Sequence, residues 1–421
     1  MNSLAMTGHA RRWITKLHRW SGLFLLLFLF VAGVTGAILS FKWELDRAIN
    51  PQLFAVEPQA TALTYTALME GVERRFPDLV VSTLVVPKTP QQSAIVYVKS
   101  RMAAHVTHVH VMGMKNELDF NQVFVDPYSG KILGQRNTTR FALTWESFIP
   151  DMVRLHYTLF LDEFGVWLMG VSALVWFLTT FLGTILIWPA AWRSFKGWKP
   201  LLSMRTRSGS YKLNYDLHRT ASLVTLPVLL VVAFTSIYLN LPGVVKPVIK
   251  AVSPVFNFAS IPSAGRMDLD SPRVTVEQAI AVATQAMPNG RNQSVGRDFI
   301  KGLYSVRMKL PGDVSASGNN TVYVRMADGQ IAFQRKAADA SAGDVFSAWQ
   351  YPLHSGEAFG LLGQCLICFG AIALVAMCVT GLNVWLRKRR SVQKRSKSIP
   401  PREQMQMPTN EERAKRPFST V

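Results

Sequence analysis

The sequence predicts a membrane protein with four transmembrane helices in two tandem repeats, each repeat carrying an α+β module on the outer side of the membrane. Three observations support this fold class. The chain has four long apolar segments, its basic residues are concentrated in three stretches, and landmarks of its first half recur about 200 residues later. Each apolar segment approaches or exceeds the roughly 20 residues that cross a bilayer as a helix.

The distribution of charge predicts which loops face the cytoplasm. The formal net charge is +20, from 46 Lys plus Arg and 26 Asp plus Glu. Residues 1–20, 189–219 and 387–421 hold 22 of the basic residues and only four acids, which leaves 24 basic and 22 acidic residues elsewhere. Because basic residues are enriched in cytoplasmic loops, we expect both termini and the middle loop in the cytoplasm. No base- or phosphate-contacting motif accompanies the charge, so the bilayer is the expected partner and nucleic acid is not.

The first half begins with a cytoplasmic N-terminus, residues 1–22, and a transmembrane helix, residues 23–41. A cleaved signal peptide is the alternative, but the segment is longer than a signal core, and Phe41-Lys42-Trp43-Glu44 offers no small-residue cleavage site. An outer module follows at 42–150, and residues 151–189 contain an outer histidine and the second transmembrane helix. Apolar periodicity predicts one helix and several strands in the module, at 63–76, 80–86, 93–98 and 122–125, followed by a turn at 126–133.

The second half repeats this order. A basic cytoplasmic loop at 190–219 precedes the third transmembrane helix at 220–241 and a second outer module at 242–352. Residues 353–386 contain an outer histidine and the fourth transmembrane helix, and the polar, basic tail at 387–421 is expected to be disordered. The second module has its expected helix and strands at 274–287, 303–309, 321–326 and 331–335.

Matching landmarks indicate that the two halves are copies of one unit. Three pairs are separated by nearly the same number of residues: 200 for His18 and His218, 199 for Gly130 and Gly329, and 198 for His156 and His354. Agreement among landmarks of different kinds is typical of an internal repeat. An even number of spans separates the copies, so both point the same way across the membrane, as parallel repeats do.

Four of the eight histidines occupy equivalent places in this repeat. With the N-terminus inside, His18 and His218 fall at the cytoplasmic ends of the first and third spans. His156 and His354 fall at the outer ends of the second and fourth. The membrane therefore holds one histidine pair near each face, and imidazoles buried near a membrane boundary need a polar partner or a metal.

Two imidazoles per site favour haem. Histidines on neighbouring helices of a bundle can ligate an iron porphyrin from both sides, whereas zinc or copper ordinarily takes three or four protein ligands. Interfacial packing against a backbone partner is the alternative for a single histidine. Arg19 and Arg219 directly follow their histidines and Arg154 lies two residues before His156. They are candidates to pair with haem propionates, with a position at lipid headgroups as the alternative.

The second span raises a geometric difficulty. The 32 residues from His156 to Trp188 would form about 48 Å of continuous helix, more than a membrane needs. We therefore expect a break near Leu161–Gly165. Small residues recur within the spans, in Thr35-Gly36, Gly183-Thr184 and Thr380-Gly381, and they allow either helices or a flat cofactor to approach closely.

Two further groups of residues can bind metal or react. His105, His108 and His110 lie in a His/Met-rich stretch, residues 102–114, which indicates either a second metal site or a polar surface hairpin. The three cysteines, Cys365, Cys368 and Cys378, all lie in the last apolar segment. We interpret them as small apolar residues that pack in a membrane helix.

Several of these motifs together resemble the PepSY-associated transmembrane family, iron-regulated inner-membrane proteins that include ferric-siderophore reductases such as ferrioxamine reductase. The similarity covers about residues 11–390, and the helix at 274–287 resembles a PepSY helix. The matching motifs are Leu17-His18-Arg19-Trp20-Ser21-Gly22, Val125-Asp126-Pro127-Tyr128-Ser129-Gly130-Lys131-Ile132-Leu133, Leu155-His156, Leu217-His218-Arg219 and Leu353-His354.

The resemblance implies a multi-pass protein of the bacterial inner membrane with PepSY-like periplasmic modules and two haems b, each held by two histidines. His18 and His218 would ligate one haem, and His156 and His354 the other. It implies electron transfer outward to a periplasmic ferric siderophore, which releases Fe(II). The stretch 102–114 is not part of the family pattern and leaves copper or another metal open as substrate.

The sequence contains no Gly-rich dinucleotide fingerprint, so we expect a membrane quinol or a separate reductase to donate electrons. Two alternatives remain. One is a membrane-anchored periplasmic binding or regulatory protein without redox activity. The other is a siderophore or metal permease, which is disfavoured because the spans lack interior ionisable residues that would line a path.

Overall fold

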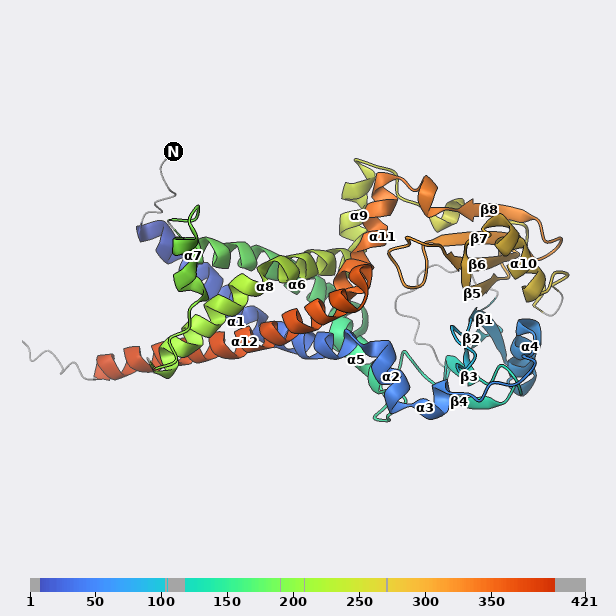
Figure 1. Ribbon diagram of the computed structural model, residues 1–421, viewed down its shortest axis with the longest axis horizontal. Coiled ribbons are helices and arrows are strands. Elements are labelled where there is room, and N and C mark those ends of the chain that lie inside the picture. Colours follow the sequence, from blue (N-terminus) through green and yellow to red (C-terminus); the bar gives the residue numbers. More distant parts are fainter. Residues whose placement is uncertain are drawn as a thin grey trace, which may run out of the picture.

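The computed structural model describes residues 8–102, 104, 118–189, 191–207, 209–269 and 272–397, with side chains up to residue 393. It consists of a four-helix bundle and, at one end of the bundle, a part built on one β-sheet, which we call the outer part (Figure 1). We call residues 8–187 the first half and residues 210–397 the second half. His105, His108 and His110 lie outside the described residues.

The bundle is formed by α1 (Gly8–Leu39), α6 (Asp162–Ile187), α8 (Ser210–Asn240) and α12 (Gly360–Lys397). Among the described residues, these four helices are long and apolar enough to cross a membrane. Helices α1 and α8 each pack against both α6 and α12. The interior between them is apolar and contains Leu25, Trp176, Leu229, Ala233, Leu374 and Met377. Large apolar side chains such as Phe24, Leu27, Leu178 and Leu362 are exposed on the outside of the bundle, which suits a lipid environment.

Three of the bundle helices extend beyond the apolar segments that predicted them. Helix α1 begins at Gly8 instead of residue 23, α8 begins at Ser210 instead of residue 220, and α12 continues to Lys397. The expectation that the tail is disordered from Arg387 is therefore wrong for residues 387–397. Lys and Arg are good helix formers, so the helices continue past the edge of the apolar segment.

A break separates the outer histidine segment from the second span, as expected. Three residues separate the end of helix α5 (Phe148–Thr158) from the start of α6. Leu159, Phe160 and Asp162 have φ values of 52°, 58° and 49°, in the left-handed region that non-glycine residues seldom adopt. Arg154 forms an ion pair with Asp162 across this break, at 3.1 Å.

The outer part contains one eight-stranded antiparallel sheet. Each half contributes four of its strands and one helix that packs on it. The first half supplies α4 (Tyr65–Arg75), β1 (Leu79–Val85), β2 (Ala94–Ser100), β3 (Gln122–Val125) and β4 (Ile132–Arg136). The second half supplies α10 (Val276–Ala286), β5 (Arg291–Asp298), β6 (Leu303–Lys309), β7 (Asn320–Arg325) and β8 (Ile331–Arg335). The strand order is β4-β3-β2-β1-β5-β6-β7-β8, so β1 and β5 join the halves.

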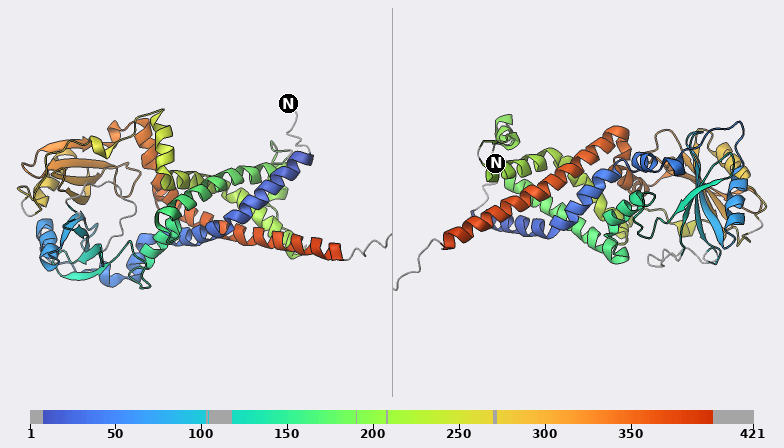
Figure 2. Two further views of the ribbon diagram at one scale, coloured as in Figure 1. Left: turned by 180° about the vertical axis from the view of Figure 1, so that it is seen from behind. Right: turned by 90° about the horizontal axis from the view of Figure 1, so that it is seen from below.

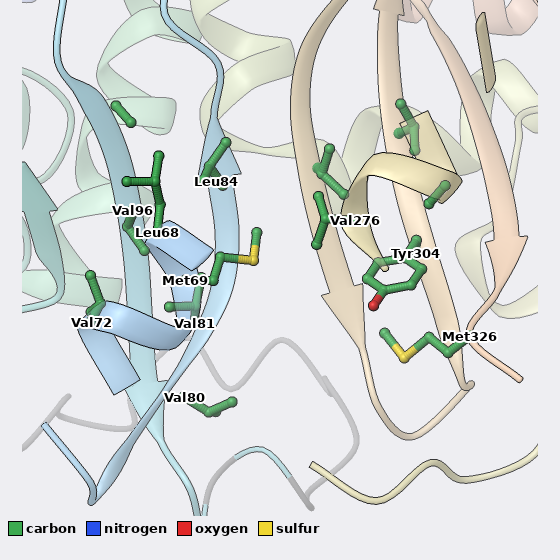
Figure 3. Close-up of a cluster of buried hydrophobic side chains, with 14 of the residues drawn as sticks. Leu68, Met69, Val72, Val80, Val81, Leu84, Val96, Val276, Tyr304 and Met326 are labelled. Atoms are coloured by element: carbon green, nitrogen blue, oxygen red, sulfur yellow. The ribbon is translucent and has the colours of Figure 1, made fainter. Parts of the chain in front are cut away.

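Helices α4 and α10 cover the face of the sheet that is turned away from the bundle (Figure 2). Their apolar faces and the strands share one buried core, part of which Figure 3 shows, with Leu68 and Met69 of α4 and Val276 of α10. Thr64 and Thr275 cap the N-termini of these two helices. On the other face of the sheet, Arg136 of β4 forms a buried ion pair with Asp46, at 2.8 Å.

Several shorter helices lie between the bundle and the sheet, and one, α7 (Phe195–Leu202), lies in the loop between α6 and α8. The others are α2 (Lys42–Ile49), α3 (Pro51–Phe54), α9 (Pro242–Lys250) and α11 (Ala342–Ser355), with 3-10 turns at Phe258–Ser260, Ala337–Asp339 and Glu357–Phe359. Helices α9 and α11 run across the bundle axis at its outer end (Figure 1). Helix α11 thereby carries His354 over the end of the bundle, and α5 carries His156.

Candidate functional site

The structure brings the four matched histidines together in two pairs. His18 on α1 and His218 on α8 have ring centres 6.5 Å apart. His156 on α5 and His354 on α11 have ring centres 6.1 Å apart. The ring planes meet at 76° and 65°, so neither contact is a stacking interaction. Each pair takes one histidine from each half of the chain. We call His18 and His218 the inner pair, and we call His156 and His354, at the end of the bundle that carries the sheet, the outer pair.

Each imidazole is held through Nδ1 by a residue of its own half. At the inner pair the acceptors are backbone carbonyls: Thr179 O for His18 at 3.3 Å and Met377 O for His218 at 3.0 Å. At the outer pair they are threonine hydroxyls: Thr35 Oγ1 for His156 at 2.8 Å and Thr235 Oγ1 for His354 at 3.1 Å. Anchoring therefore occurs within a half, and pairing occurs between halves.

These contacts define which ring nitrogen carries the proton. A carbonyl can only accept a hydrogen bond, so Nδ1 of His18 and of His218 must donate. The remaining nitrogen, Nε2, then presents a lone pair. Within the described part of the chain, no hydrogen bond engages Nε2 of any of the four rings. A second ring nitrogen held by an oxygen is the usual arrangement of a metal-ligating histidine.

Glycines give these rings their space. A Cβ atom added at Gly183 would lie 2.9 Å from Cε1 of His18, and one added at Gly381 would lie 3.2 Å from Cε1 of His218. At the outer pair, a Cβ added at Gly36 would lie 3.3 Å from Cε1 of His156. The small-residue elements of the sequence thus lie against the imidazoles. Gly36, which lies against His156, directly follows Thr35.

The outer pair is uncharged. Its helices α5 and α11 lie outside the four candidate spans. Burial lowers the pKa of His156 to about 3, with a contribution from the neighbouring His354 and opposition from the carbonyl of Ala32. Burial also lowers the pKa of His354 to about 4. Both rings are therefore neutral near pH 7, which is the form in which an imidazole binds a metal.

The two pairs fit an iron porphyrin by spacing and donor type. An imidazole nitrogen lies about 2 Å from a metal that it ligates, so two imidazoles on opposite sides of one ion have ring centres about 6 Å apart. The described residues contain no cluster of three or more His, Cys, Asp or Glu side chains that could hold a metal ion. A two-histidine site suits a metal that brings its other ligands with it, as haem does. The role of the four histidines as iron ligands stays a prediction.

The three candidate arginines differ in what already binds them. Arg219 forms an ion pair with Asp216 at 3.2 Å and donates to the carbonyls of Pro200 and Ser203. Arg154 is engaged by Asp162. Nε of both Arg19 and Arg219 is buried without a hydrogen-bond partner, but the described residues give Arg19 no ion pair or hydrogen bond at all, and its guanidinium lies over the ring of Trp20. Arg19 therefore fits an anionic group such as a propionate better than the other two do.

A family model described as the PepSY-associated TM region matches residues 15–388, which is most of the chain. The chain belongs to this family. The match includes all four paired histidines and both halves of the sheet. No curated protein matches the chain significantly.

Sequence reasoning found the four histidines but not the groups that hold them. Thr35 and Gly36 were noted as a small-residue element, yet neither was assigned to His156. The carbonyls of Thr179 and Met377 carry no sequence signal, because every residue has one. The signal that was available is the matched spacing: Thr35 and Thr235 are separated by 200 residues, as His18 and His218 are.

Proposed function

We propose that this protein is a di-haem oxidoreductase of the bacterial inner membrane that passes electrons outward to a periplasmic ferric siderophore and releases Fe(II). One observation supports this most strongly. Two histidine pairs, each formed between the halves, have ring centres 6.5 and 6.1 Å apart, with Nδ1 of each ring engaged and Nε2 without a partner in the described residues.

Haem b, when bound, would supply reversible one-electron chemistry between Fe(III) and Fe(II). The residues of the chain would supply position and environment. His18 and His218 would hold one haem and His156 and His354 the other, with Nδ1 of each ring fixed by its oxygen acceptor. The apolar interior around Leu25 and Trp176 would exclude water between the two sites.

The two sites lie toward opposite ends of the bundle. On α1, His18 of the inner pair and Thr35, which holds His156 of the outer pair, are 17 residues apart, or about 26 Å of helical rise. On α8, His218 and Thr235 have the same separation, so we propose that electrons pass from one site to the other along the bundle. We propose that a membrane quinol or a separate reductase donates electrons on the inner side, with both termini in the cytoplasm.

The outer part would receive the substrate. We propose that the two halves are tandem repeats and that their sheet segments are PepSY modules. Charged side chains from both halves act on Lys88 of the outer part. Burial and the charges of Arg47 and Lys309 lower the pKa of Lys88, while Glu357 and Glu44 oppose this. Lys42 also donates to the Tyr351 hydroxyl at 2.6 Å, across the halves. The excess of cations favours a chelate that carries negative charge.

A dithionite-reduced absorption spectrum of the purified protein tests the proposal. We expect two haems per chain, with sharp bis-histidine bands. His18→Ala or His218→Ala should remove one haem, and His156→Ala or His354→Ala should remove the other. His9→Ala is the matched control, because in the described residues this exposed histidine is hydrogen-bonded to Trp13 of its own helix and lies in neither pair.

A preparation that is folded and monodisperse but colourless would reject the redox function. It would favour the membrane-anchored binding protein, because such a protein needs no cofactor. Haem in both sites combined with transport of an intact ferric chelate into vesicles, without reduction, would favour the permease instead.

A further inference from the structure

We propose that Thr35 and Thr235 are positioning residues for the outer histidine pair and that they tune the redox potential of this site without affecting the inner one. The inference rests on the proposed function, because it requires haem at both pairs. It goes further, because it names side chains that control one site alone.

The two threonines have the same geometry in both halves. Thr35 and Thr235 are 2% and 1% exposed, and each lies inside a bundle helix. Thr35 donates its hydroxyl hydrogen to the carbonyl of Val31 at 2.7 Å, and Thr235 donates to that of Val231 at 2.9 Å. With its hydrogen used in this way, each hydroxyl oxygen can only accept from histidine.

This arrangement defines the tautomer of both outer ligands. Nδ1 of His156 donates to Thr35, and Nδ1 of His354 donates to Thr235. Nε2 of each ring is then left as the lone-pair nitrogen that can bind iron. A hydroxyl donating to a carbonyl is also a better acceptor, because hydrogen bonds in a chain polarise one another.

The inner pair is built differently. Its closest Nδ1 acceptors are the backbone carbonyls of Thr179 and Met377, which no side-chain substitution removes. Thr380 lies near His218 Nδ1 as well, but at 3.4 Å, farther than the carbonyl at 3.0 Å. In both halves, a carbonyl is the closest Nδ1 acceptor at the inner pair, and a threonine hydroxyl is hydrogen-bonded to Nδ1 at the outer pair.

The chemical consequence follows from ligand basicity. A hydrogen-bond acceptor at Nδ1–H makes the imidazole a stronger donor to its metal, which favours Fe(III) over Fe(II). Removing the acceptor should raise the midpoint potential of the outer site. The carbonyls of Ala32 and Val232 also act on these rings, so we expect a shift in potential before loss of the haem.

The experiment is a potentiometric titration of the haem-loaded protein, followed by absorption. Thr35→Val and Thr235→Val remove the hydroxyl at nearly constant volume. We expect each to raise one of the two midpoint potentials and leave the other unchanged, and both to shift the same one. Thr35→Ser and Thr235→Ser keep the acceptor and should restore the wild-type value. Thr225→Val is the matched control and should shift neither potential, because this buried threonine donates to the carbonyl of Ala221 and has no histidine contact in the described residues.

The outcomes separate this inference from the function on which it rests. If the wild-type protein binds no haem, the proposed function fails. If it binds two haems and the valine variants leave both potentials unchanged, or shift both equally, the inference is wrong. If a valine variant loses the outer haem entirely, recovery in the serine variant supports positioning, and absence of recovery contradicts it.

Discussion

Gly183 contacts His18 so closely that a single added methyl group should disturb the inner site. In Gly183→Ala the new Cβ would lie 2.9 Å from Cε1 and 3.4 Å from Nδ1 of His18. Non-bonded carbon atoms rest about 3.5–4.0 Å apart, so the ring would have to retreat by roughly 0.6–1 Å. Metal–ligand distances tolerate only about 0.2 Å. We therefore expect haem affinity at the inner site to fall by about 10- to 100-fold, as for other losses of ligand support.

The global stability of this variant should change little. Overpacking costs about 1–3 kcal/mol, and replacing glycine with alanine in a helix returns about 1 kcal/mol. The assay is the haem-to-protein ratio during dilution, with thermal unfolding of the same samples measured in parallel. Gly22→Ala is the matched control, because a Cβ at Gly22 would meet nothing within 4 Å. Retention of both haems in Gly183→Ala, with unchanged spectra, would refute the assignment of His18 as a ligand.

Three other predictions concern charged residues. Asp46→Ala leaves Arg136 buried without its partner, so the outer part should lose about 3–5 kcal/mol, measurable as a lower unfolding midpoint; an unchanged midpoint would contradict it. Arg19→Gln should accelerate haem loss from the inner site more than Arg219→Gln, because Arg219 is already held by an aspartate and two carbonyls; equal rates would argue against a propionate contact at Arg19. Lys309→Ala should raise KM for anionic ferric chelates and leave KM for cationic ones unchanged, as steady-state reduction assays would show. An equal effect on both would contradict a role of Lys309 in selecting chelates by their charge.

Periodicity and charge predicted most of the fold. The strands at 303–309 and 331–335 were placed at their observed bounds, because their apolar and polar residues alternate and turns flank them. Strand β5 was missed. Its sequence, Arg-Asn-Gln-Ser-Val-Gly-Arg-Asp, is almost entirely polar, and only Val295 and Arg297 are buried. Its place in the sheet comes from pairing with β1 and β6, which no local pattern reveals.

The candidate site was predictable only in part. The repeat and the topology predicted that His18 and His218 share one face of the membrane, and His156 and His354 the other. Their anchors depend on tertiary contacts. For example, Thr35 is 121 residues from His156, and its hydroxyl is hydrogen-bonded to Nδ1 of that ring. The contact depends on the fold near His156, where the chain breaks its helix at Leu159. Sequence spacing gives no measure of such a contact until the fold is known.

The pairing of β1 with β5 limits how the molecule can move. Thr83, Leu84 and Val85 of the first half are hydrogen-bonded in register with Gly296, Val295 and Ser294 of the second. The halves are therefore joined outside the membrane as well as inside it. Carriers that work by alternating access rock one half against the other, and here that motion would break the hydrogen bonds between β1 and β5. Two halves that are joined both in the bundle and in the sheet suit electron transfer, because an electron can cross without the opening of a path.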